Sequence, residues 1–103
     1  MAKNFSLRYS PLFHDDLDKI IDYIALELKN IAAAKQLIND IEAAIKQQQA
    51  HPLQYATYKS INKRRNPYRR IIVGNFLIFY VVIDDAMIIR RILYGRRDIR
   101  KIL

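Results

Sequence analysis

The chain has 103 residues, of which 51% are hydrophobic and 27% are charged, with only 2 Gly and 3 Pro. This length is typical of one domain, and this composition argues against a disordered or collagen-like chain. The absence of Cys excludes disulfides, thiolate metal sites and cysteine nucleophiles. We therefore expect a single domain over residues 1–103.

Apolar stretches in the sequence are short. The longest unbroken one covers residues 76–83, far fewer than the roughly 20 residues of a membrane-spanning helix. The first ten residues hold no apolar segment of signal-peptide length. We therefore expect a soluble, cytoplasmic protein.

The net charge of +8 is distributed unevenly. Residues 1–58 carry a net charge of −1, whereas residues 59–103 carry +9. Such asymmetry predicts a positive face that attracts phosphate or acidic protein surfaces. The alternative is a solvated basic surface that only aids solubility.

The first predicted elements are a strand and a helix. Residues 3–9 alternate between apolar and polar side chains, which is typical of a half-buried strand. Ser10 followed by Pro11 then resembles a helix N-cap with proline at the first helical position. Apolar residues recur at helical spacing from Phe13 to Leu28, so we expect a helix from about Pro11 to Lys29.

A second amphipathic helix is predicted from Ile31 until His51 and Pro52 end it. The break around Asn30 is short. Two helices joined by a brief connection form an antiparallel hairpin.

Three further strands are predicted after a basic stretch, at residues 68–73, 76–83 and 87–94, because these segments are rich in β-branched and aromatic residues. Gly74-Asn75 and Asp84-Asp85 indicate tight turns, so the three strands should form an antiparallel meander. The middle strand is apolar on both faces and needs a cover on each. The C-terminal tail or a docked partner could supply the second cover.

The predicted elements together give an α+β fold class, with order β-α-α-β-β-β and the two-helix hairpin on one face of a mostly antiparallel sheet of about four strands.

Common catalytic and metal motifs are absent. The sequence has no GxSxG, Walker, GxGxxG or HExxH pattern. His14 and His51 lack partners at metal-ligand spacing. Asp15, Asp18 and Asp22 share a helix face and could together hold a hard cation, but solvated surface charge is the favoured interpretation. We expect no metal and no cofactor.

Arginine and lysine gather with tyrosine in the C-terminal half. Arginine binds phosphate through a planar fork and tyrosine offers a stacking face, so this set suits contact with nucleic acid or an acidic target. It also suits metal-free RNA cleavage, in which arginine stabilises the phosphate charge and a lysine or tyrosine moves protons. For the strand tyrosines, packing is the alternative role. The candidate binding residues are Lys59, Lys63, Arg64, Arg65, Arg70, Tyr94 and Arg96, within a wider set that includes Arg69, Arg90, Arg91, Arg97, Arg100, Lys101, Tyr58, Tyr68 and Tyr80.

Seven segments of the sequence carry a resemblance to known proteins: Tyr9-Ser10-Pro11, Asp16-Leu17, residues 20–24, Pro52, Tyr68-Arg69, residues 75–80 and the closing Ile92 to Asp98, in which Gly95-Arg96-Arg97-Asp98 is the most telling piece. Together they resemble the RelE/ParE superfamily of toxins from type II toxin-antitoxin modules. The resemblance spans nearly the whole chain and implies the fold described above, together with an antitoxin that wraps the toxin and masks its basic face. A toxin dimer or a larger toxin–antitoxin assembly is also compatible with it.

Two activities occur in that superfamily. RelE-like members cut messenger RNA on the ribosome, whereas ParE-like members poison DNA gyrase without cutting nucleic acid. The RelE-like basic positions fall on Arg69, Ile71, Leu77 and Arg97, and the terminal tyrosine falls near Leu103. Only Arg69 and Arg97 keep their charge and could serve as catalytic residues, while Leu77 cannot neutralise a phosphate. The resemblance therefore favours the ParE-like branch.

Three hypotheses follow for function. The first is a growth-inhibiting toxin that acts on gyrase and is neutralised by an antitoxin. The second is a RelE-like, ribosome-dependent endoribonuclease that would also recruit Arg65, Arg70 or Arg96. The third is a non-toxic nucleic-acid-binding module of the same fold, because fold alone does not fix function.

Overall fold

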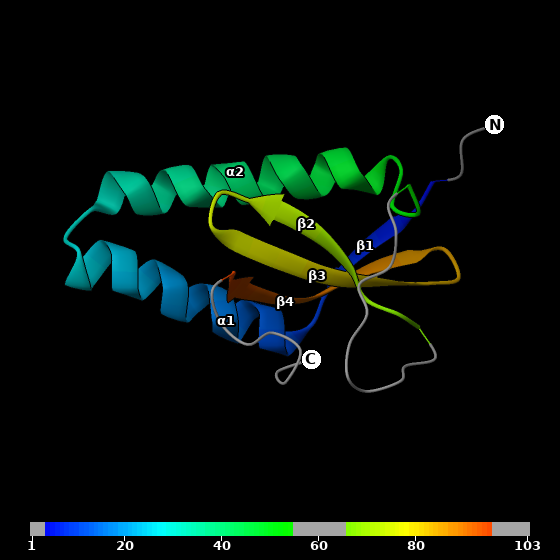
Figure 1. Cartoon of the computed structure of the whole chain (residues 1–103), viewed down its shortest axis with the longest axis horizontal. Helices are drawn as coiled ribbons and strands as arrows, with labels where there is room; N and C mark the ends of the chain where they lie inside the picture. Colours follow the sequence, from blue (N-terminus) through cyan, green and yellow to red (C-terminus); the bar gives the residue numbers. More distant parts are fainter. Residues whose placement is uncertain (1–3, 55–65, 96–103) are drawn as a thin grey trace.

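The computed structural model describes residues 4–54 and 66–95, which form two layers (Figure 1). One layer is a helical hairpin made of α1 (Pro11–Asp22), the π-helical turn η1 (Tyr23–Glu27) and α2 (Ile31–Gln49). The other layer is a four-stranded sheet of β1 (Ser6–Tyr9), β2 (Arg69–Val73), β3 (Phe76–Ile83) and β4 (Ala86–Tyr94). Their order along the chain confirms the expected α+β arrangement.

The sheet has the strand order β1-β4-β3-β2. Strands β2, β3 and β4 form the antiparallel meander that the turn residues predict, while β1 pairs with β4 in parallel. Gly74 and Asp84, at the two hairpin turns, both have positive φ angles, of 57° and 53°. Strands β1 and β2 are therefore the two edges of the sheet that the described residues form.

The helix boundaries follow from local chemistry. The Ser10 side chain accepts a hydrogen bond from the backbone of Phe13, and Pro11 occupies the first turn of α1, as predicted. The Asn30 side chain accepts from the backbone of Ala33 at 3.0 Å and begins α2. Both caps use a side-chain oxygen to satisfy a backbone N–H that has no partner within the helix.

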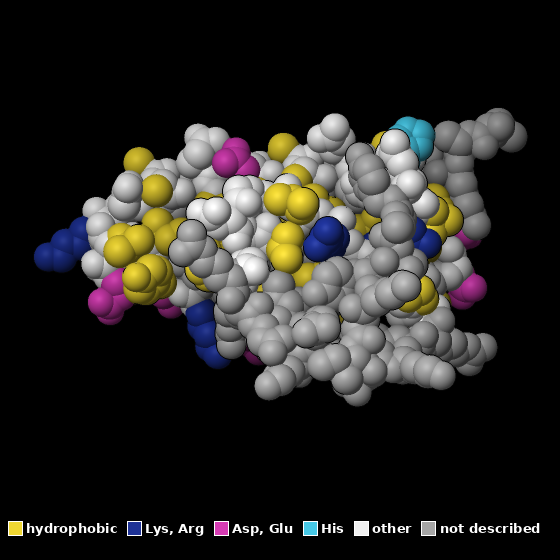
Figure 2. All heavy atoms as spheres, viewed as in Figure 1, with side chains coloured by type: hydrophobic (Ala, Val, Ile, Leu, Met, Phe, Trp, Pro, Cys, Tyr) yellow, Lys and Arg dark blue, Asp and Glu magenta, His cyan; other side chains and the backbone are white. Residues whose placement is uncertain are grey.

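The end of the hairpin differs from the prediction. The periodic pattern placed Leu28 and Ile31 on the apolar, inward face, yet the two side chains are 56% and 62% exposed. Both residues lie at the connection between the helices, which extends beyond the end of the sheet (Figure 1). The same end of the hairpin contains η1, in which Leu28 donates its N–H to the carbonyl of Tyr23, five residues earlier. Figure 2 shows hydrophobic side chains gathered at the surface of this end of the molecule.

The main core lies between the helices and the sheet. It contains Phe13, Ile41 and Ile45 from the helices and residues such as Ile78 and Met87 from the strands. The opposite face of the sheet, called here the outer face, carries a second cluster of Tyr68, Phe79, Val81 and Leu93. Strand β3 thus buries side chains on both faces, as expected. The C-terminal tail, which the sequence suggested as a cover for the outer face, lies outside the described residues.

Neither helix of the described segments offers an apolar stretch long enough to cross a membrane.

Candidate functional site

Three of the nine predicted site residues lie in the described part of the chain. Arg69 and Arg70 are neighbours on the edge strand β2, and Tyr94 ends β4. The other six fall outside the described residues, so their placement stays a prediction: Lys59, Lys63, Arg64, Arg65, Arg96 and Arg97.

Arg69 and Arg70 point to opposite faces of the sheet because successive strand residues alternate. Arg69 lies opposite Tyr80 on the helix-facing side, and its guanidinium is 3.5 Å from the carbonyl oxygen of Leu53. Arg70 lies opposite Phe79 on the outer face and is exposed. The adjacent arginines therefore do not act as one phosphate clamp. Arg69 contacts the segment after α2, and Arg70 presents its charge outward.

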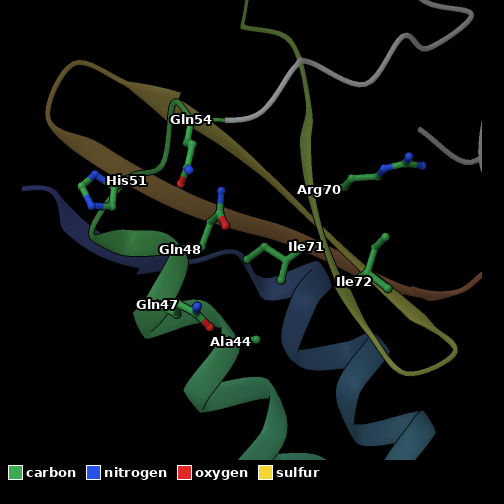
Figure 3. A pocket seen from close by; sticks show the side chains of 8 residues that line it. All are labelled: Ala44, Gln47, Gln48, His51, Gln54, Arg70, Ile71 and Ile72. Atoms are coloured by element: carbon green, nitrogen blue, oxygen red, sulfur yellow. The ribbon is translucent and has the colours of Figure 1, made fainter.

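A hollow of about 550 Å³ lies between the C-terminal half of α2 and β2 (Figure 3). Gln47 and Gln48 reach it from α2, and Ile71 points from β2 toward Gln48. Arg70 and Ile72 project on the other side of the strand. The hollow therefore joins amide groups to an apolar wall and one guanidinium, a mixture suited to a peptide or protein segment. The full lining is Ala44, Gln47, Gln48, His51, Gln54, Arg70, Ile71 and Ile72.

A chain of hydrogen bonds connects Gln48, which lines this hollow, to the core of the sheet. The Tyr80 side chain is fully buried, and its hydroxyl donates to the carbonyl of Pro52 at 2.6 Å. The same hydroxyl accepts a hydrogen bond from the Gln48 amide at 2.9 Å. Tyr80 therefore ties the turn after α2 to the centre of the sheet.

The candidate tyrosines have structural roles in this chain. Tyr80 and Tyr68 are 0% and 6% exposed, so neither presents a stacking face to nucleic acid, and packing, the alternative role considered for the strand tyrosines, is the one that they have. Tyr94 is 38% exposed and its ring lies 5.8 Å from that of Phe76. Of these three, Tyr94 alone combines packing with an accessible surface.

Arg91 is committed to an intramolecular ion pair, which the sequence did not reveal. Its Nε and Nη2 donate to the two carboxylate oxygens of Asp16 at 2.7 and 3.0 Å. Their side chains are only 20% and 14% exposed. Hydrogen bonding to the Asp16 carboxylate raises the pKa of Arg91, and burial only partly opposes this increase. Arg91 therefore has a structural role and is no longer a candidate binding residue.

Asp16 also closes the open edge of β4. Strand β1 ends at Tyr9, opposite Ile89, so among the described residues no strand lies beside β4 beyond that point on this side. The Asp16 carboxylate accepts the N–H of Ile92 at 3.2 Å, and the Ser10 hydroxyl donates to the carbonyl of Arg90 at 2.7 Å. Arg90 sits at a β-bulge, because Phe79 pairs with Arg91 whereas Tyr80 pairs with Ile89.

The sequence did hold a signal for Asp16. It lies next to Leu17 and three residues after Phe13, on the apolar side of α1. A carboxylate there needs a cationic or N–H partner inside the fold. By contrast, Asp15, Asp18 and Asp22 are exposed, and no group of three or more potential His, Asp or Glu ligands occurs within residues 4–54 and 66–95.

A two-helix hairpin over one face of a β1-β4-β3-β2 sheet, with the first strand parallel to the last, defines a RelE/ParE-like toxin fold. Residues 7–99 match the family model described as ParE toxin of type II toxin-antitoxin system, parDE. The chain belongs to this family of toxins. It has no significant match among curated proteins.

Solved structures show the same fold at low sequence identity. A chain of the chromosomal ParDE TA system from P. aeruginosa has a TM-score of 0.68 and 23% identity, covering 88% of this chain and 96% of that one. A chain of the RelB-RelE antitoxin-toxin complex from Methanococcus jannaschii has a TM-score of 0.52 and 25% identity, covering 93% and 98%. A chain of the E. coli DinJ-YafQ toxin-antitoxin complex has a TM-score of 0.58 and 11% identity, covering 88% and 92%.

Proposed function

We propose that this toxin inhibits bacterial growth by acting on DNA gyrase and that a cognate antitoxin neutralises it. The match to the ParE family model over residues 7–99 supports a ParE-like target. The similar structures include toxin–antitoxin complexes, which supports an antitoxin as the partner.

The observation that favours gyrase over messenger RNA is the packing of two positions that the superfamily resemblance assigns to phosphate chemistry. Ile71 is 8% exposed and belongs to the core beneath the helices. Leu77 packs against the outer-face cluster. An apolar side chain within a packed cluster cannot stabilise charge on a scissile phosphate. RNA cleavage would therefore lack two of its four basic groups.

The target would contact the exposed positive surface that includes Arg70. This arginine lies on the outer face at the edge strand β2 and also borders the hollow beside α2. We propose that Tyr94 and the predicted residues Lys59, Lys63, Arg64, Arg65 and Arg96 belong to the same binding surface. An acidic antitoxin segment would neutralise the toxin by covering it.

The test is a gyrase supercoiling assay run beside a ribosome-bound messenger RNA cleavage assay with the purified chain. We expect inhibition of supercoiling and no cleavage. Arg70→Ala should weaken the inhibition, while Arg8→Ala, an exposed arginine on β1, serves as the matched control. Unchanged growth after induction of the chain without an antitoxin would refute the toxin role itself.

The second candidate is a RelE-like endoribonuclease, which the charge retained at Arg69 and Arg97 favours. This candidate predicts cleavage of messenger RNA in a reconstituted translation reaction, with loss of cleavage in Arg97→Ala. Cleavage that persists in Arg97→Ala would speak against it.

A further inference from the structure

The end of the helical hairpin exposes an apolar surface. Four large side chains lie within nine residues there: Tyr23, Leu26, Leu28 and Ile31, called here the tip patch. They are 57%, 68%, 56% and 62% exposed. Figure 2 shows hydrophobic side chains gathered at this end of the molecule with charged side chains beside them. The patch lies at the far end of α2 from the hollow beside β2 (Figures 1 and 3).

Backbone hydrogen bonds hold the tip patch in one conformation. The π-turn places the N–H of Leu28 3.0 Å from the carbonyl of Tyr23, and Asn30 donates to the carbonyl of Ile24 at 3.1 Å. Lys29 adopts a positive φ of 51°, which allows the chain to reverse direction before α2. A preorganised surface loses little conformational entropy on binding, and π-helical turns occur frequently at functional sites.

The size of the patch suits a protein contact. Four large side chains that are each more than half exposed offer roughly 400 Å² of apolar surface, within the range in which the largest patch of a monomer is often functional. Two such patches facing each other, with their polar rims, approach the roughly 1,200 Å² of the smallest stable interfaces.

Charge argues against an acidic partner at this end. Residues 15–42, which contain both arms of the hairpin around the patch, hold seven acidic and three basic side chains. A polyanion or an acidic antitoxin segment is therefore attracted to the basic C-terminal half and not to the tip.

The rim of the patch is complementary to itself. Glu27 and Lys29 flank the exposed Leu28, and both charged residues are exposed. In a contact with two-fold symmetry, Glu27 of each copy can face Lys29 of the other copy, so the contact contains two ion pairs.

We propose that the tip patch is a symmetric contact between two copies of this chain. The contact leaves Arg70 and the hollow uncovered in both copies, and it does not depend on the identity of the toxin's target.

The first experiment measures the mass of the purified full-length chain by sedimentation equilibrium over a concentration series through the micromolar region. We expect a monomer–dimer equilibrium that Leu26→Glu weakens by at least about tenfold, because the buried carboxylate is desolvated. Leu12→Glu is the matched control, since Leu12 is 55% exposed near the start of α1, away from the patch. Circular dichroism checks that both variants remain folded.

The second experiment uses the absence of cysteine in the chain. Leu28→Cys places a single thiol between Glu27 and Lys29, at the position that this two-fold contact brings opposite its own copy. It should form a disulfide-linked dimer under mild oxidation, whereas the exposed control Lys46→Cys, on the C-terminal half of α2, should not. A wild-type chain that is monomeric throughout the concentration series would overturn the proposal. Equal dimerisation of wild type and Leu26→Glu would also overturn it, as would a tip variant that loses only antitoxin binding.

Discussion

Asp16 on α1 and Arg91 on β4 form the ion pair that joins the helical hairpin to the sheet. The carboxylate is shared between the guanidinium and the backbone N–H of Ile92, so one side chain both pairs a charge and completes a strand edge. Asp16 and Arg91, which are 75 positions apart in the chain, are thereby connected beside the last residues of β4. Asp16 therefore holds the part of β4 that lies between Ile89 and Tyr94, where β1 no longer pairs with it.

Removal of this carboxylate should destabilise the fold. Asp16→Asn keeps the shape of the side chain but leaves Arg91 without its counter-charge, and we expect a loss of about 2–3 kcal/mol in the free energy of unfolding. The measurement is denaturant unfolding monitored by circular dichroism. Asp15→Asn, at an exposed neighbouring position, should change the stability little. Equal effects of the two substitutions would show that the ion pair contributes nothing.

The hydroxyl of Tyr80 is predicted to stabilise the turn after α2. Tyr80→Phe removes the donor to Pro52 and the acceptor for Gln48, so two partner groups lose hydrogen bonds. We expect a loss of about 1–3 kcal/mol in the free energy of unfolding. Thermal unfolding compared with Tyr23→Phe, a position that is 57% exposed, provides the test. A Tyr80→Phe protein as stable as its control would contradict this role.

The turn between β2 and β3 depends on the backbone conformation of Gly74. Its φ of 57° is unfavourable for residues with a Cβ, although no atom lies within 4 Å of the position that a Cβ would occupy. Gly74→Ala should therefore cost about 1 kcal/mol through backbone strain alone. Gly74→Asn should cost less, because Asn tolerates this conformation. Chemical denaturation of both variants measures the difference, and equal losses would exclude strain as the cause.

Tyr9 should make stability depend on pH in the alkaline range. Burial, with a smaller effect from the charge of Glu42, raises the pKa of Tyr9 above its ordinary value of 10.0. The folded state thus favours the protonated phenol, so the contribution to stability is complete below pH 10.0 and is lost as the pH rises through the folded-state pKa.

The corresponding experiment compares unfolding of wild type and Tyr9→Phe at pH values below and above 10.0. The variant should lose less stability on the alkaline side. Glu42→Gln should give an intermediate profile, because it removes only the smaller of the two causes. Parallel profiles for wild type and Tyr9→Phe would refute the assignment.

Local sequence signals determined the secondary structure with accuracy. Ser10 and Asn30 accept the cap hydrogen bonds, and both tight turns lie where Gly74-Asn75 and Asp84-Asp85 indicate. These elements could be predicted because caps and turns depend on residues that are near one another in the chain. The alternation and periodicity of apolar residues also predicted the two-layer arrangement of helices and sheet.

The candidate site was predicted less well, because the sequence does not show which group a charged side chain contacts in the folded protein. Arg91 and Arg70 are indistinguishable by composition, yet the Arg91 side chain is 20% exposed and lies against Asp16, while Arg70 is an exposed residue that borders a hollow. Tyr80 and Tyr94 are likewise both strand tyrosines, and only the register of the sheet places Tyr80 in the core.

The sequence by itself determined the order of the elements, the uneven charge and the resemblance to a toxin family. Tertiary structure alone decided that Arg91 pairs with Asp16, how Asp16 closes β4, and that Leu28 and Ile31 are exposed at the end of the hairpin. The physical reason is distance along the chain. Helix caps and turns depend on residues that are close together in the sequence. Ion pairs, the capping of a strand edge and burial depend on contacts between distant segments, which only the folded chain brings together.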